Sequence, residues 1–399
     1  MRIRLRNPDR QVEAEGPMSV AELLDHLDVL PHTVLVLHEA ALVTADHVLP
    51  ADAEVEIRPV ISGGAESAPR CAICRAPAVL EERRHRAAWC AEHLVDHVHR
   101  QVRKAIDHPP ARPDGERMCS YDDRLLVAVS GGKDSLALWD ALDTMGYRVD
   151  GLYVGLGIGG YSQRSQEVCQ SFAAARGLRL HVVDLAATYG YGTPSGAAAS
   201  GRSTCGVCGL SKRYAFNRVA VDHGYDVLVT GHNLDDEAAT LLGNVLRWQE
   251  TFLARQHPVL PATGTNQVRK IKPLYRLSER ESAAYCVVRG IDYVVEECPL
   301  VDGNTGHDLK AAFDLLEHGA PGLKAQFLFG FYDRQERLVD PVTADDVTVG
   351  ACTSCGMPTT GQTCAFCRQR ELILAALPVT GGVDSRGGAA VTADRAARG

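Results

Sequence analysis

The sequence has no apolar run close to the roughly 20 residues that a membrane-spanning helix needs. Its first ten residues, MRIRLRNPDR, also lack the apolar core of an export signal. With 45% apolar and 23% charged residues, the composition excludes a disordered or fibrous chain. These absences predict a folded cytoplasmic protein with no membrane partner, and its 399 residues are enough for about two to four domains.

Cysteine is not scarce, since the chain has 13 of them. A disulfide scaffold is nevertheless excluded, because such scaffolds are typical of short exported chains. In a long chain without an export signal, the cysteines favour metal binding or redox chemistry.

The formal net charge of -8 argues at first against a nucleic-acid partner. Residues 1–64 hold 5 Lys/Arg and 11 Asp/Glu, however, so about -6 of that charge belongs to them. The remainder is close to neutral and has basic runs at residues 83–86, 100–104 and 269–276. These runs are as compatible with solvated faces as with contacts to RNA phosphates.

Residues 1–64 read as strand, strand, helix, strand, strand, and they end in Gly63-Gly64. This order and ending resemble a β-grasp ubiquitin-like sulfur carrier of the MoaD and ThiS type. Such carriers deliver sulfur as a terminal thiocarboxylate, whereas Gly64 is in peptide linkage to Ala65. Either a peptidase, for instance of the JAMM type, cuts after Gly64, or the domain is a docking module and another donor serves. We favour cleavage.

The rest of the chain divides into a linker and four further segments. Residues 65–70 form the linker, 71–110 a small Cys/His module with a helix, 111–340 an alternation of strands and helices, 341–372 a second cysteine module, and 373–399 a tail expected to be disordered. The alternation predicts an α/β fold, a doubly wound parallel sheet covered by helices on both faces. Its strands are expected at residues 124–130, 146–155, 178–185, 225–232 and 291–297.

The strongest motif is SGGKDS at residues 130–135, between a buried strand and a helix. Two glycines let the backbone approach an anion, and the helix N-terminus favours negative charge there. The spacing is not that of a Walker loop. It is similar to the SGGxDS loop of the PP-loop ATP pyrophosphatases, the adenine nucleotide α-hydrolase-like fold, which bind ATP and adenylate a substrate oxygen.

A second motif, GHNLDDEA, places His232, Asp235 and Asp236 after a strand. The acidic pair opens a helix, where carboxylates complement the helix dipole, so a well-capped helix start is one interpretation. Beside a phosphate loop on the same sheet edge, the motif favours a site that positions Mg²⁺ or the reacting groups.

A third motif consists of Cys205 and Cys208 before a helix, with Cys298 after the last expected strand. Three thiolates can bind three irons of a [4Fe-4S] cluster and leave the fourth iron open to a sulfur atom. The lack of a nearby fourth Cys or His in the sequence favours this over closed structural zinc. A catalytic dithiol remains the alternative.

Two groups of four ligands have the spacing of structural zinc sites, and we expect them to brace the fold and help to grip RNA. They are Cys71, Cys74, Cys90 and His93, and Cys352, Cys355, Cys364 and Cys367. The leftover Cys119, Cys169 and Cys286 are interpreted as ordinary small residues.

The order of these motifs over residues 71–370 resembles the tRNA 2-thiouridine synthetases of the TtuA and Ncs6/Ctu type. The resemblance implies that ATP is held by Ser130, Gly131, Gly132, Lys133, Asp134, Ser135, Gly157, His232 and Asp235. It implies cluster ligation by Cys205, Cys208 and Cys298, and roles in the chemistry for Lys212 and Asp236. Lys212 as an ordinary solvent-facing helix residue is the alternative.

The resemblance also implies a reaction and partners. ATP would convert the uridine C2 oxygen to an adenylate, and sulfur would then displace AMP. The implied partners are tRNA, an E1-like activating enzyme and a sulfurtransferase for the carrier, and a second copy of the chain in a homodimer. Closeness to the TtuA type favours position 54; wobble uridine 34, cytidine or a small metabolite as the acceptor remain alternatives. So does a non-catalytic, ATP-sensing zinc protein that binds RNA.

Overall fold

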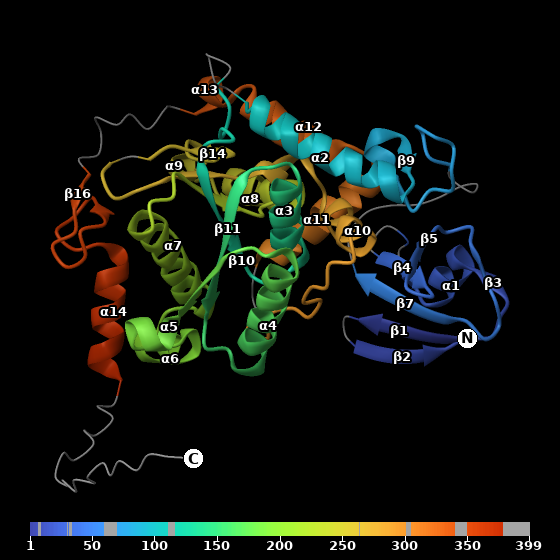
Figure 1. Ribbon diagram of the computed structural model, residues 1–399, viewed down its shortest axis with the longest axis horizontal. Coiled ribbons are helices and arrows are strands. Elements are labelled where there is room, and N and C mark those ends of the chain that lie inside the picture. Colours follow the sequence, from blue (N-terminus) through green and yellow to red (C-terminus); the bar gives the residue numbers. More distant parts are fainter. Residues whose placement is uncertain are drawn as a thin grey trace, which may run out of the picture.

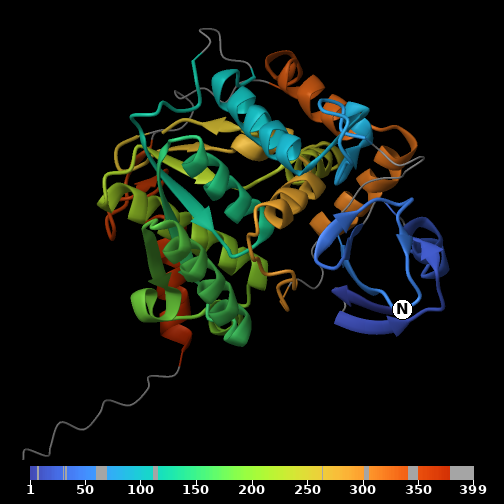
Figure 2. The same ribbon diagram turned by 45° about the vertical axis from the view of Figure 1, so that its right-hand side comes forward.

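The structure is a computed structural model that describes residues 1–6, 9–29, 31, 34–59, 70–110, 116–262, 264–300, 305–339 and 349–377. Gly63 and Gly64, and the linker up to residue 69, lie outside these ranges. The first domain, a central domain and a carboxyl-terminal module follow one another along the chain, and the first domain and the module lie on opposite sides of the central domain (Figures 1 and 2).

The first domain is a five-stranded sheet in the order β2-β1-β7-β4-β5. β1 is antiparallel to β2 and parallel to β7, and β7 is antiparallel to β4. The helix α1 begins with a capping box between Ser19 and Glu22, and its buried Leu23 and Leu24 cover one face of the sheet. The elements are β1 Arg2–Arg6, β2 Asp9–Glu13, β3 Met18–Ser19, α1 Val20–His26, β4 Val34–His38, β5 Ala41–Val43, β6 Val48–Leu49 and β7 Glu54–Pro59.

The next segment contributes a short hairpin and a long helix. Its elements are β8 Leu80–Glu82, the 3-10 helix η2 Arg83–His85, β9 Ala87–Trp89 and α2 Ala91–Asp107. The apolar face of α2, with Leu94, Val98 and Val102, is buried in the same core as the central sheet. The helix therefore packs as part of the central domain, while the cysteine loop before it stands at the surface.

The central sheet has the order β12-β11-β10-β13-β15-β14, parallel except for the edge strand β14. Leu125 and Val127 of β10 enter one core and Leu126 enters the other, so both faces are covered. The strands are β10 Arg124–Val129, β11 Arg148–Gly155, β12 Leu180–Asp184, β13 Val227–Thr230, β14 Val259–Leu260 and β15 Arg269–Ile271.

Helices surround this sheet (Figures 1 and 2). The core that contains Leu126 is closed by α7, and the core that contains Leu125 is closed by α3, α8 and α10. The helices are α3 Lys133–Thr144, α4 Gly159–Arg176, α5 Leu185–Tyr189, α6 Thr193–Ser200, α7 Thr204–Asp222, α8 Leu234–Leu246, α9 Glu250–Leu253, η3 Pro273–Arg276, α10 Glu279–Val288, α11 Thr305–Gly319, α12 Leu323–Tyr332 and α13 Gln335–Leu338.

One expected strand is wrong. Residues 291–297 form no strand, although Ile291 and Tyr293 alternate in burial as a strand would. This segment instead crosses the end of the sheet, where the N–H of Val294 donates to the carbonyl oxygen of Gly131 over 2.8 Å. The fifth parallel strand is β15, inside the basic run at residues 269–276.

The carboxyl-terminal module consists of β16 Gly350–Ala351, β17 Pro358–Thr359 and α14 Ala365–Ala376. Its core is shared with α6 and α7, because Phe366 and Ile373 belong to one cluster with Ala197 of α6 and Val207 of α7. The tail expected from residue 373 is wrong for its first residues, because α14 continues to Ala376 and Ile373 is buried. Residues 378–399 lie outside the described residues.

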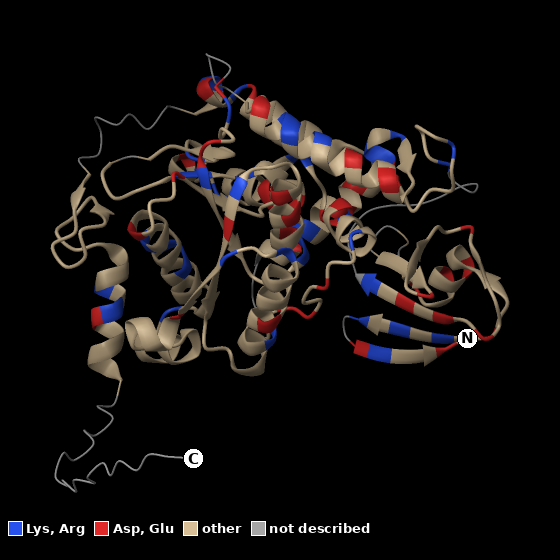
Figure 3. Cartoon of the chain, in the orientation of Figure 1, with Lys and Arg blue, Asp and Glu red and all other residues tan. Residues whose placement is uncertain are grey.

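Lys and Arg are interleaved with Asp and Glu over the elements (Figure 3). Much of the expected basic surface is used internally: Arg84 pairs with the buried Glu281, Arg269 with Asp123 and Lys272 with Glu237. By contrast, the run at residues 100–104 has exposed arginines on α2. No helix among the described residues is long and apolar enough to cross a membrane.

Candidate active site

The turn between β10 and α3 is held tightly by its own side chains. Gly131 has φ +80°, and a Cβ there would lie 2.9 Å from the carbonyl oxygen of Ser165. Ser135 Oγ donates to the carbonyl oxygen of Gly132 over 2.9 Å and accepts from the N–H of Ser130 over 3.2 Å. Because α3 begins directly after this turn, its free N–H groups and dipole face the same point. The arrangement suits a phosphate group.

The two charged residues of the turn are linked to its surroundings. Lys133 Nζ lies 3.0 Å from Asp134 Oδ2 and 3.4 Å from Glu279 Oε2. Burial alone would lower the pKa of Lys133, but Asp134 and Glu279 outweigh it and raise that pKa well above its ordinary value. Asn233 Nδ2 donates to Asp134 Oδ1 over 3.0 Å. Lys133 and Asp134 thus connect the turn to α8 and α10.

The carboxyl end of β13 touches the start of α3. A Cβ on Gly231 would lie 3.0 Å from the backbone nitrogen of Ser135, so a larger residue would push the two elements apart. The next residue, His232, has Nδ1 2.9 Å from Thr230 Oγ1. Protein atoms packed around the ring, followed by the nearby Lys272, lower the pKa of His232, although part of its side chain reaches solvent.

Asp235 is buried in a structural network. It is 4% exposed and pairs with Lys324, which also pairs with Asp314. Its other oxygen accepts from the N–H of Glu279 over 2.8 Å. These contacts join α8 to α10, α11 and α12, and they engage both oxygens of the carboxylate that the sequence assigned to ATP.

Asp236 is more accessible, with 28% of its side chain exposed. It accepts from the N–H of Asn233 over 3.2 Å in a capping box and pairs with Lys310 of α11. The capped helix start is therefore confirmed. A role of Asp236 in positioning Mg²⁺ or the reacting groups stays a prediction.

Gly157 follows β11 at the same edge of the sheet. Its φ is +70°, and a Cβ on it would lie 3.1 Å from Cα of Gly192. The loop before α6 therefore packs directly on the backbone of Gly157, at the same sheet edge as the turn at residues 130–135.

Cys205 and Cys208 lie in the first two turns of α7, which Ser203 caps. Because α7 runs antiparallel to the strand that follows it, its N-terminus lies at the carboxyl edge of the sheet. Cys205 is exposed and Cys208 is half-buried. Burial raises the pKa of Cys208, and Lys212, one turn further along the helix, opposes this rise.

Cys298 approaches from the other side. It follows the segment that is hydrogen-bonded to Gly131, and it is half-buried. Tyr161 of α4 lies near it: burial raises the pKa of Tyr161, and the thiols of Cys298 and Cys208 raise it further. In the structure Cys208, Cys298 and Lys212 thus lie near one another. Tyr161 lies there too, which the sequence did not indicate.

The spacing of sulfur atoms separates this triad from the two four-ligand groups. In each four-ligand group all ligand atoms lie within 4.8 Å of one another, with Cys74 and Cys90 Sγ 3.7 Å apart and Cys355 and Cys364 Sγ 3.8 Å apart. Tetrahedral zinc with Zn–S of about 2.3 Å places its sulfurs about 3.8 Å apart. Cys205, Cys208 and Cys298, which the structure also describes, do not meet this criterion.

The remaining cysteines are buried and inert, as expected. Cys169 and Cys286 lie on α4 and α10, and Cys119 precedes β10. Burial raises the pKa of Cys119 and of Cys169 to about 12, which leaves both as neutral thiols.

Sequence reasoning missed the partners that fix the acidic residues. These are Asn233, Glu279, Lys310 and Lys324. It also missed Tyr161, which lies near the thiols of Cys208 and Cys298. Asn233 and Glu279 stand next to helix starts in the printed motifs GHNLDDEA and LSERE, which is a signal for capping. The two lysines come from α11 and α12, far away in sequence, and no local pattern connects them with α8.

Comparison with known proteins shows which family the chain belongs to. Residues 94–299 match the model of the PP-loop domain, and residues 70–95 match that of the 2-thiouridine synthetase TtuA, N-terminal LIM domain. The chain is 48% identical over 303 residues to a tRNA-5-methyluridine(54) 2-sulfurtransferase of Thermus thermophilus, covering 76% of this chain and 91% of that protein. A protein of the same name from Pyrococcus horikoshii is 38% identical over 299 residues, covering 75% and 93%.

Among solved structures, the fold is similar to the U34-tRNA thiolase NcsA from Methanococcus maripaludis, determined with its [4Fe-4S] cluster. The TM-score is 0.60 with 23% identity, over 70% of this chain and 91% of that one. At this identity the likeness shows the fold alone. The two family models and the 48% identical relative show the family: the chain belongs to the TtuA-type tRNA 2-thiouridine synthetases, which are ATP-dependent tRNA sulfurtransferases built on a PP-loop domain.

Proposed function

We propose that this chain replaces the C2 oxygen of uridine or 5-methyluridine 54 in tRNA with sulfur. The position is that in the name of the relatives from Thermus thermophilus and Pyrococcus horikoshii. The observation that carries the proposal is the meeting of two sites at one sheet edge. The turn at residues 130–135 and the thiols of Cys208 and Cys298 both lie there, joined by the hydrogen bond between Val294 and Gly131.

The phosphate groups of ATP would lie against the backbone N–H groups of the turn and the N-terminus of α3. The uridine C2 oxygen attacks the α-phosphorus, and pyrophosphate leaves. A hydrosulfide then attacks C2, and AMP leaves with the oxygen. In this scheme Lys212, near Cys208, stabilises the negative charge that develops in the exchange, and the partly exposed Asp236 holds the Mg²⁺ ion that accompanies ATP.

Cys205, Cys208 and Cys298 fit a [4Fe-4S] cluster better than a zinc ion. Their spacing is not that of the compact four-ligand groups, and a cluster distributes its cysteines over separate irons. Such a cluster, bound by three thiolates, supplies an iron at which sulfur can be held for transfer.

The two four-ligand groups are proposed as structural zinc sites. Their sulfur separations match tetrahedral coordination, and His93 Nδ1 lies 3.5 Å from Cys71 Sγ and 3.1 Å from Cys90 Sγ. The first group precedes α2 and its exposed arginines, and the second closes against α7. Zinc here would fix the helices that carry the tRNA-facing surface and the cysteine pair.

We also propose that the first domain is a β-grasp sulfur carrier. Support comes from its strand order, in which the first and last strands are parallel neighbours at the centre, and from α1 on one face. Cleavage after Gly64, for instance by a JAMM-type peptidase, would create the terminus for a thiocarboxylate. An E1-like enzyme and a sulfurtransferase would then load it, and the synthetase would work as a homodimer.

Thiolation is tested directly with anaerobically purified protein, ATP, sulfide and unthiolated tRNA. Nuclease digestion and mass spectrometry should reveal a 2-thionucleoside that depends on ATP and maps to position 54. A product at position 34, on cytidine or on a small metabolite would reassign the substrate. Binding of ATP and tRNA without any product, from iron-loaded protein, would contradict the proposal and favour a non-catalytic RNA-binding protein.

A further inference from the structure

The outer face of the first sheet is covered. β4 reads Val-Leu-Val-Leu, and Val34 and Val36 enter the domain's own core against α1. Leu35 and Leu37 point the opposite way and are 3% and 2% exposed. A half-solvated strand would alternate apolar and polar residues, so this run of four apolar residues indicates burial on both faces.

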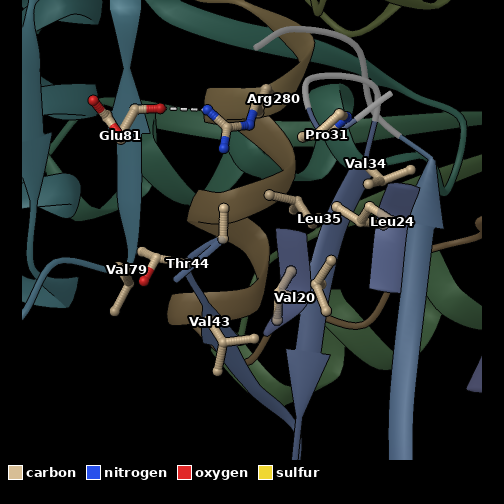
Figure 4. A pocket seen from close by; sticks show the side chains of 12 residues that line it. Val20, Leu24, Pro31, Val34, Leu35, Val43, Thr44, Val79, Glu81 and Arg280 are labelled. Atoms are coloured by element: carbon tan, nitrogen blue, oxygen red, sulfur yellow. Dashed lines mark hydrogen bonds between the residues drawn. The ribbon is translucent and has the colours of Figure 1, made fainter. Parts of the chain in front are cut away.

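The covering surface belongs to the central domain. Leu35, Leu37 and Leu42 of β5 form one buried cluster with Leu80 and Trp89 of the hairpin. A small cavity of about 50 Å³ remains at this junction, with Val79, Glu81 and Arg280 on one wall and β4 on the other (Figure 4). Arg280 of α10 donates to the carbonyl oxygen of Glu81, which fixes that wall independently of the first domain.

Charged residues extend the contact toward the active site. The guanidinium of Arg58, near the end of β7, lies 5.8 Å from the ring centre of Tyr293, and Arg6 lies 3.9 Å from Glu296. Tyr293 and Glu296 belong to the segment that is hydrogen-bonded to the phosphate-binding turn and leads to Cys298. The first domain therefore also contacts the segment that precedes Cys298.

We propose that the first domain is a bound subunit of its own enzyme: after cleavage beyond Gly64 it stays on the face formed by Val79 and α10, beside the segment that contains Tyr293 and Glu296. This rests on the proposed processing and adds the partner, because the carrier acts on the synthetase from which it was cut. The first domain and the rest of the chain would then stay together through this non-covalent interface and not through the peptide bond.

The test separates the interface from the chemistry. A recognition sequence for a specific protease replaces residues 65–69 of the full chain, and the folded protein is cut in vitro. In size-exclusion chromatography at micromolar concentration, the fragment 1–64 should elute with the remainder in a one-to-one ratio. Elution of the fragment at its own size under these conditions would overturn the proposal.

Two substitutions locate the interface. Val79→Glu alters only the central side, and Leu37→Asp alters only the carrier side; each should weaken retention of the fragment by at least tenfold. Val48→Asp is the matched control, because Val48 is a 63% exposed apolar residue of the same domain, away from this face. Retention unchanged by Val79→Glu, with zinc content preserved, would place the contact elsewhere and contradict the proposal.

Failure of the proposed function would give a different result. Co-elution is measured without tRNA, ATP or sulfur, so a chain that retains its fragment but never thiolates tRNA would refute the activity alone. A chain that thiolates tRNA but loses its fragment would refute the bound subunit alone.

Discussion

At the scale of single residues, the spacing of cysteines divides them into two chemical classes. Sulfur atoms about 3.8 Å apart suit one tetrahedral ion, and more widely placed sulfurs suit a cluster. We therefore predict that Cys298→Ser removes iron and abolishes thiolation but leaves zinc in place. Elemental analysis of anaerobically purified protein, together with the visible absorption of the cluster, measures both metals.

The reciprocal variant is Cys355→Ser, which belongs to a compact four-ligand group. It should lose about one zinc ion, because three ligands no longer close the tetrahedron, and keep its iron. If Cys298→Ser kept its iron, or lost zinc instead, the triad would be a dithiol or a zinc site rather than a cluster site.

Glu281 gives a pH-dependent prediction. Its carboxylate is fully buried and pairs with Arg84 and His97. Burial alone would raise the pKa of Glu281, but Arg84 and the histidines His85 and His97 lower it well below its ordinary value. The stability it contributes is therefore complete above the unfolded pKa of about 4.3 and is lost as the pH falls below it.

We expect Glu281→Gln to lower the free energy of unfolding by about 3–5 kcal/mol at pH 7, since it breaks a buried ion pair. The difference in free energy of unfolding between the variant and the unchanged chain should shrink below about pH 4, where Glu281 of the unfolded chain becomes protonated. Thermal unfolding across this pH range measures it. Glu54→Gln, at an exposed pair with Arg2, is the control and should change little at any pH; a pH-independent loss in Glu281→Gln would argue for packing instead of charge.

At the scale of elements, the turn between β10 and α3 is set by backbone geometry. Gly131→Ala would place a methyl group 2.9 Å from the carbonyl oxygen of Ser165 at φ +80°, so we predict that the turn opens and ATP affinity falls at least tenfold. Gly146→Ala shares the positive φ, +86°, but meets no atom within 4 Å. It should cost about 1 kcal/mol of stability and leave ATP affinity unchanged. Isothermal titration with ATP compares the two, and equal losses would show that backbone strain, not the contact with Ser165, matters.

Four of the five expected parallel strands are confirmed, because each is a β-branched run that alternates with a helix along the chain. The segment at residues 291–297 has the same alternation, but its backbone finds its partner in Gly131 rather than in a neighbouring strand. The three-residue strand β15 was not expected, because two of its residues are the charged Arg269 and Lys270. The local sequence pattern indicates that a segment is buried. Which buried segment pairs with a neighbouring strand depends on the assembled sheet.

Only the parts of the candidate site that depend on local sequence could be predicted. The turn at residues 130–135 and the cysteine spacings are local signals, so they were visible in the sequence. The different environments of Asp235 and Asp236 depend on Lys324 and Lys310, which come from helices about 75–90 residues away in the chain. Burial of Arg84 likewise depends on Glu281 and could not be read from a basic run.

At the scale of the whole molecule, the chain combines a proposed carrier with the enzyme it serves. We predict that protein purified without oxygen from its own host contains a fragment that ends at Gly64, heavier than the calculated fragment by the difference between a sulfur and an oxygen atom. Intact mass spectrometry measures it. Full-length chain alone would show that the first domain is a docking module, and Gly64→Val, which should block processing, would then leave thiolation unchanged.

The strand β4 contributes Val34 and Val36 to one core and Leu35 and Leu37 to another. Its order in the chain has a consequence for synthesis on the ribosome. The first domain leaves the ribosome about 220 residues before α10 is made, which at 5–20 residues per second is roughly 10–45 s. During that time Leu35, Leu37 and Leu42 lack the part of their cover that α10 provides, so the nascent chain exposes apolar surface, which favours aggregation, until α10 folds onto this sheet face.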